Sequence, residues 1–202
     1  VIKTPSYVVS PGAGDDYRCF VVDLEHAGTE YLTGLSVTPG DKRVVHHVVL
    51  FHAKGAAAAE AKARDKADPD AGYTCFGDAG VEAGIIGGWA PGTAVARYPA
   101  DSGIPLDGSG VVIVQMHFYP GLQPTEDSTT IGLSLAESVT YPARIGGSAD
   151  RQLAVAPGQT QATSSIAWNL YGGTSTVHGV FPHMHKRGTR LRFDLVNDKG
   201  RT

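Results

Sequence analysis

The sequence predicts an all-β protein, and three observations carry this prediction. Segments rich in Val, Ile, Leu, Phe and Tyr recur along the chain and are separated by turn residues. Gly occurs 26 times and Pro 12 times in 202 residues, which is typical of short strands joined by many turns. Only one stretch has the composition of a helix. A chain of this length can form one large all-β domain, or one domain and part of another.

Five segments in the first part of the chain are predicted to be strands because they are rich in β-branched and aromatic residues. They are residues 17–24, 31–37, 43–52, 111–118 and 130–136. Turn signals fall between them, at residues 39–41 (PGD), 107–110 (DGSG) and 120–121 (PG).

Residues 56–67 (AAAAEAKARDKA) predict the single helix, because Ala, Glu, Lys and Arg are good helix formers without β-branching. This segment has little apolar bulk, so we expect an exposed excursion between strands. The glycine-rich residues 77–92 are expected to form a loop.

A composition shift at residues 141–150 (YPARIGGSAD) predicts a linker and divides the chain into domains 1–147 and 148–202. Strands are expected beyond it, near residues 151–155, 160–168, 175–184 and 189–196. About four strands do not make a self-sufficient sandwich. We therefore expect the second domain to be incomplete here and to be completed by further C-terminal chain or a partner fragment.

Composition argues against nucleic-acid binding and against a membrane-spanning protein. The net charge is −3, charged residues make up 18% of the chain, and there is no basic run, so nucleic acid is not an expected partner. No apolar stretch approaches the ~20 residues of a membrane span.

Histidines on predicted strands are the strongest chemical signal. His46 and His47 are adjacent in RVVHHVVLFH, and His117 lies on a separate strand in VIVQMHFYP. Neighbouring residues of a regular strand face opposite ways, so both members of the pair reach one metal only where a bulge re-aims one of them. Otherwise one faces solvent and the other packs. Three imidazoles from two strands would suit copper or zinc.

His183 and His185 form a second pair, two residues apart in GVFPHMHKRG. At that spacing both side chains leave the same face of a strand, which makes a two-point metal clamp, although the spacing also fits two histidines on a polar face. The other three histidines are interpreted as structural or surface residues. They are His26, expected in an exposed turn, His52 and His178.

The only cysteines are Cys19 and Cys75. An even count is compatible with one disulfide in an oxidising compartment, and equally with two free buried thiols.

Six short motifs, taken in order, resemble the copper type II, ascorbate-dependent monooxygenases. The matching segments are residues 15–20 (DDYRCF), 46–51 (HHVVLF), 73–76 (YTCF), 89–92 (WAPG), 115–119 (QMHFY) and 182–185 (PHMH). The resemblance extends over most of the chain. The sequence has a single pair of cysteines, fewer than the animal members have, which indicates a bacterial-type relative with fewer disulfides.

The resemblance implies two antiparallel, jelly-roll-like β-sandwich domains, each with one copper. His46, His47 and His117 would bind the copper that delivers an electron, while His183 and His185, with a methionine, would bind the copper where O2 and substrate meet. It further implies a disulfide between Cys19 and Cys75, a secreted or periplasmic protein, an ascorbate-like one-electron reductant, and hydroxylation of an unactivated C–H bond in a small-molecule or peptide-like substrate.

The sequence departs from the family pattern at two further places. Its two methionines, Met116 and Met184, do not lie where the copper-binding methionine is expected, well downstream of His185. Phe181 stands where the peptide-amidating members carry a carboxylate-binding arginine, so a glycine-extended peptide is not an expected substrate.

Gln115 and Tyr17 are predicted to support the first copper without binding it. Gln115 is two residues before His117, so both leave the same face of the strand. It would order water or a ligand near the metal, or else be a buried glutamine bonded to backbone.

Two other functions compete with the enzyme. One is a secreted copper-binding or electron-relay protein without oxygenase activity. The other is a zinc hydrolase at His46, His47 and His117, which would need a carboxylate base beside the metal, and none is evident near those strands.

Overall fold

The computed structural model describes residues 1–12, 14–24, 26, 28–148, 150, 152–170, 175–182, 188–196 and 200. The chain divides into two units, Val1–Gly147 and Ser148–Thr202, and each is described by itself. The described strands and the helix all lie in the first unit.

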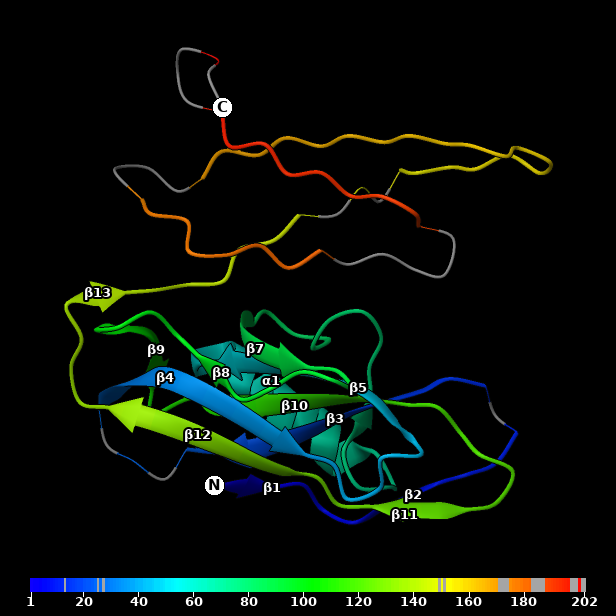
Figure 1. The fold of residues 1–202 in the computed structure, drawn as a ribbon. Helices are drawn as coiled ribbons and strands as arrows, with labels where there is room; N and C mark the ends of the chain where they lie inside the picture. Colours follow the sequence, from blue (N-terminus) through cyan, green and yellow to red (C-terminus); the bar gives the residue numbers. More distant parts are fainter. Residues whose placement is uncertain are drawn as a thin grey trace. The chain divides into compact units, whose positions relative to one another are not determined.

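Two β-sheets make up most of the described first unit (Figure 1). One sheet has the order β1 (Ile2–Lys3), β12 (Thr130–Ala136), β4 (Thr29–Thr38), β9 (Ser102–Asp107), β13 (Tyr141–Pro142), and β8 (Ala96–Arg97) also pairs with β4. The other has the order β6 (Tyr73–Thr74), β3 (Asp16–Asp23), β10 (Val111–Phe118), β5 (Val45–Ala53), β7 (Gly84–Trp89). A small ribbon pairs β2 (Tyr7–Val9) with β11 (Thr125–Asp127). Apart from the parallel pair β9–β13, the pairings are antiparallel.

The main hydrophobic core lies between the two sheets. Alternate residues of β10, Val112, Val114, Met116 and Phe118, face side chains of the opposite sheet that include Leu32. Strand β10 is buried along its whole length because its other face is covered too. The prediction of an all-β sandwich fold is confirmed.

A second core covers the outer face of the sheet that contains β10. It joins Cys19, Val111 and Ile113 to two alanines of α1 (Gly55–Ala67), Ala58 and Ala61. The helix begins and ends close to the predicted positions and lies between strands with most of its residues exposed, as expected, but Ala58 and Ala61 are buried against the sheet. Alanine side chains are small, so this face of the helix packs on the sheet without large apolar residues.

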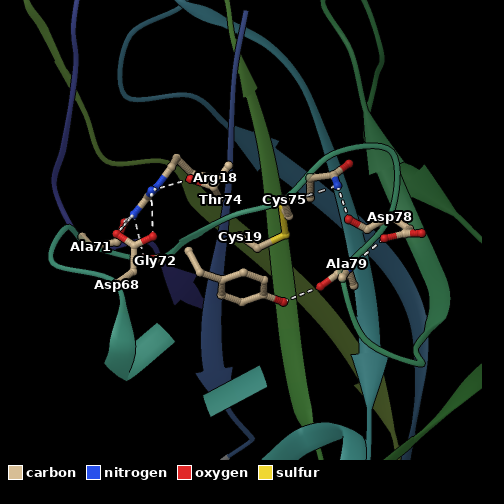
Figure 2. Close-up of a disulfide and its surroundings, with 12 residues drawn as sticks. Arg18, Cys19, Asp68, Ala71, Gly72, Thr74, Cys75, Asp78 and Ala79 are labelled. Atoms are coloured by element: carbon tan, nitrogen blue, oxygen red, sulfur yellow. Dashed lines mark hydrogen bonds and ion pairs between the residues drawn. A yellow bond between two sulfur atoms is a disulfide. The ribbon is translucent and has the colours of Figure 1, made fainter. Parts of the chain in front are cut away.

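The chain between α1 and β6 is held by one buried arginine. Arg18 donates hydrogen bonds to the Asp68 carboxylate, at 3.1 and 3.3 Å, and to the carbonyl oxygens of Ala71 and Gly72 (Figure 2). Gly72 has φ +73°, and a Cβ there would lie 2.8 Å from the carbonyl oxygen of Cys19, so only glycine fits. This loop leads directly to Cys75, which forms a disulfide with Cys19.

The five strands predicted for the first unit are present. β10 and β12 have the predicted bounds, and β3, β4 and β5 differ by one or two residues at their ends. The prediction that the glycine-rich residues 77–92 form a loop is wrong in part, because β7 lies within this segment and pairs with β5.

The second unit differs from expectation in its described residues. These contain no strand and are almost all exposed, so the four strands expected between residues 151 and 196 are not formed there. The physical reason is that apolar, β-branched sequence makes a strand only when a neighbour accepts its ladder hydrogen bonds. His183 and His185 lie outside the described residues.

Candidate metal centre

His46, His47 and His117 meet on the outer face of the sheet that contains β10. The strand register places Tyr17 of β3 opposite His117 of β10, and His117 opposite His47 of β5. Directly opposed residues point to the same face, so the three side chains form one row across three strands. His117 is buried, whereas His46 and His47 at the start of β5 are more exposed.

A bulge brings His46 into the same group. His117 pairs with His47, but Phe118 pairs with Val45, so the register shifts by one residue and His46 is the extra one. Val45 and Val48 both lie in the core between the sheets, on either side of the two outward-facing histidines. The structure thus contains the distortion that an adjacent ligand pair requires.

The three Nδ1 atoms converge. Their separations are 3.2 Å between His46 and His47, 3.0 Å between His46 and His117, and 3.3 Å between His47 and His117. A point equidistant from all three lies about 1.8 Å from each, close to the about 2.0 Å bond between a metal and an imidazole nitrogen. Within the described residues, this is the one group of three metal-ligating side chains that could hold an ion.

Hydrogen bonds alone do not account for this convergence. A neutral imidazole has one donor nitrogen and one acceptor nitrogen, so three Nδ1 atoms in mutual contact cannot all be satisfied by one another. A cation among them satisfies all three lone pairs. Burial, and then the neighbouring His46, lower the pKa of His117, which favours the neutral imidazole that a metal binds.

Aromatic rings hold His117 from one side. Tyr17 stacks on it with ring centroids 4.1 Å apart and an interplanar angle of 8°. Phe76 packs its ring edge-to-face on Tyr17 at 4.9 Å and is itself 76% exposed. Tyr17 therefore contacts a candidate ligand, as a supporting residue would, and Phe76 extends the stack to the surface.

The disulfide fixes the aromatic stack. Cys75 precedes Phe76, its sulfur is bonded to Cys19 on β3, and its backbone N–H donates to the carbonyl oxygen of Tyr17 at 3.2 Å. Tyr17 and Cys19 are two residues apart on β3, so they leave the same face of the sheet. One covalent link thus holds the loop that carries Phe76 beside the strand that carries Tyr17.

The Gln115 side chain contacts the loop at residues 75–78. Its Nε2 donates to the carbonyl oxygen of Asp78 at 2.6 Å and lies 3.6 Å from the sulfur of Cys75. These contacts favour the second of the two roles considered for it, a buried glutamine that holds a loop through its backbone.

The other described histidines are not members of this group of three. His52 binds the carbonyl oxygen of Asp107 through Nε2 at 3.1 Å, and His178 is exposed. His26 was expected in an exposed turn, but both its ring nitrogens are buried, and Nε2 lies 3.5 Å from Glu30. The ring packs against the turn at Gly108, where a Cβ would lie 2.8 Å from Nδ1 of His26.

Two neighbours of the centre were not singled out from the sequence. Phe76 and Asp15 both belong to matched motifs, next to Cys75 and two residues before Tyr17 respectively. Asp15 places its Oδ2 3.5 Å from Nε2 of His117. Their positions in the motifs were the available signal, but residue type alone gave them no role.

Comparison with known proteins supplies the remaining evidence. Residues 2–122 match the family model for the N-terminal domain of the copper type II ascorbate-dependent monooxygenases. No curated protein matches the chain.

No described helix has both the length and the apolar character that a membrane crossing requires.

Proposed function

We propose, from the premise that this chain belongs to the copper type II ascorbate-dependent monooxygenase family, that His46, His47 and His117 bind a copper ion. The observation that carries the proposal is the convergence of three Nδ1 atoms within 3.0–3.3 Å, inside the segment that matches the family's N-terminal domain. Copper bound there would supply one-electron chemistry for the hydroxylation of an unactivated C–H bond with O2 and an ascorbate-like reductant.

The residues of the centre suit that chemistry. Three neutral imidazoles accept both oxidation states of copper, so the ligand set need not change as an electron passes. The β-ladders fix His47 and His117 opposite each other, and Tyr17 limits rotation of the His117 ring. Met116 is fully buried between the sheets, so its thioether is not available at this centre.

We further propose that residues 148–202 belong to a second copper-binding domain. His183 and His185 would hold the second copper there, together with a methionine other than Met116 and Met184. Substrate and O2 would meet at that second site. The support for this part is the spacing of the two histidines and the family to which the chain belongs.

An extracytoplasmic location is part of the proposal. The disulfide between Cys19 and Cys75 is compatible with an oxidising compartment. Both cysteines are buried members of the second core, on the outer face of the sheet that contains β10.

Metal analysis and turnover assays together test the proposal. The purified protein, as it occurs naturally, should bind two copper ions per chain and consume O2 with ascorbate while forming a hydroxylated product. Replacing His178 with Ala serves as a control, because this histidine is exposed and has no proposed role. Bound copper without product would instead favour the copper-binding or electron-relay protein, and the absence of bound copper would overturn both.

A further inference from the structure

We propose that Asp15 is a positioning residue for the copper centre, and that its carboxylate accepts a hydrogen bond from Nε2–H of His117. This inference rests on the proposed function, because it concerns the same three imidazoles. It adds a residue that orients one ligand and strengthens it as a donor. Carboxylates that accept the outer N–H of a metal-bound histidine act in this way in other metal sites.

The argument begins with the proton on His117. Its Nδ1 faces the other two histidines, at 3.0 and 3.3 Å, so the proton of the neutral ring belongs on Nε2. Nε2 of His117 is buried and makes no hydrogen bond with a described residue. A buried N–H without an acceptor is unfavourable, so an acceptor at this position would favour the ring orientation seen.

Asp15 is placed to be that acceptor. Its Oδ2 lies 3.5 Å from Nε2, slightly beyond a normal hydrogen bond, and its side chain is 51% exposed. An exposed side chain of this kind can close the remaining distance by a small rotation, at little cost in packing.

The same short segment constrains His117 in two directions. Tyr17 covers the face of the imidazole ring, and Asp15, two residues earlier, approaches its edge. Rotation about the Cβ–Cγ bond of His117 would swing Nδ1 away from His46 and His47. Stacking on Tyr17 opposes this rotation at the ring face, and a bond at Nε2 would oppose it at the ring edge.

The neighbouring Asp16 provides a matched control. Its Oδ2 accepts a hydrogen bond from the hydroxyl of Tyr7 at 2.8 Å, so it has a different partner. Replacing Asp16 with Asn removes the same charge one residue away. Comparison of the two variants therefore separates a directed hydrogen bond from a general effect of negative charge.

The experiment measures copper affinity by competition with a chelator, and the electron paramagnetic resonance spectrum of the bound Cu(II). Asp15→Ala should weaken copper binding by about 10- to 100-fold and change the spectrum. Asp15→Glu should recover part of the affinity, because it restores a carboxylate. Asp16→Asn should bind copper like the unaltered protein, and the metal-free Asp15→Ala variant should keep the circular dichroism spectrum of the unaltered protein.

Other results would overturn the inference. Equal losses of affinity in Asp15→Ala and Asp16→Asn would mean that charge alone matters, and a loss accompanied by a changed circular dichroism spectrum of the metal-free protein would mean a general structural role. Unchanged affinity in Asp15→Ala, alongside weakened binding in His117→Ala, would refute the role of Asp15 and leave the copper site standing. If His117→Ala itself binds copper normally, the proposed function fails with it.

Discussion

At the scale of single residues, His117 is the member of the candidate centre that the fold holds most firmly. It is buried, paired in register on both sides, and stacked on Tyr17. Changing His117 to Ala should reduce copper binding of the 202-residue chain by about one ion, because two imidazoles leave a site of poor affinity. Metal analysis after gel filtration would measure this. Retention of the same copper content by the variant would show that the ion binds elsewhere.

His52 should make the stability of the metal-free protein depend on pH. Burial lowers the pKa of His52 below that of the unfolded chain, about 6.5, although its bond to the Asp107 carbonyl oxygen opposes the shift. As the pH falls through about 6.5, the unfolded chain takes up a proton that the folded ring resists, so the free energy of unfolding decreases. The contribution of His52 to the free energy of unfolding is therefore present above this pH and is lost as the pH falls below it.

The variant His52→Gln should remove that dependence while keeping a donor for the Asp107 carbonyl oxygen. Urea unfolding at pH 7.5 and 5.5 would compare the two proteins, and the unaltered one should lose more stability. The two proteins differ only at residue 52, so the difference between their losses reports on this position. Equal losses in both proteins would contradict the prediction.

Residue chemistry predicted some members of the centre and missed others for a physical reason. Histidine has few roles on a core strand, so three of them on two strands indicated a metal. Glutamine and aspartate have many roles, and side-chain direction decides among them. Gln115 turned toward the carbonyl oxygen of Asp78, while Asp15 reaches Nε2 of His117, and neither direction can be read from residue type.

At the scale of elements, the disulfide is expected to stabilise the folded state. It joins residues 56 positions apart, and loop-closure entropy puts the effect at about 4 kcal/mol. The double variant Cys19→Ala, Cys75→Ala should lower the free energy of unfolding of the metal-free protein by up to that amount, as measured in denaturant. A thiol titration of the denatured, unreduced parent should find no free thiol. Two free thiols, or an unchanged stability, would count against the prediction.

The predicted elements succeeded where sequence and burial agree. Strand β10 is apolar on both faces because both faces are covered, and its bounds were predicted correctly. Strand β7 was missed because it contains three glycines. A Cβ at Gly87 would lie 2.6 Å from Leu35 of the opposite sheet, so that glycine reflects close packing rather than a loop. The short strands β1, β2, β6, β8 and β13 depend on partners distant in sequence, which a local pattern does not reveal.

At the scale of the whole molecule, the two hydrophobic cores lie entirely within residues 1–147. We therefore expect a protein of residues 1–147 to fold by itself and to bind one copper ion. Circular dichroism should show a β-rich protein with a cooperative thermal transition, and metal analysis should give about one copper per chain. The same fragment carrying His117→Ala is the control for binding at the proposed site. An unfolded fragment would mean that residues 148–202 contribute to the stability of the first unit.

The single extra residue at His46 has a consequence in genetic terms. Without it, β5 and β10 would run as an uninterrupted ladder, with Val45 still opposite Phe118 and still facing the core. His47 and His117 would remain a cross-strand pair. One codon inserted into a regular strand is thus enough to turn a two-nitrogen pair into a three-nitrogen cluster, and its deletion would undo the change. A lineage can gain or lose this centre in one mutational event while the sandwich core stays as it was.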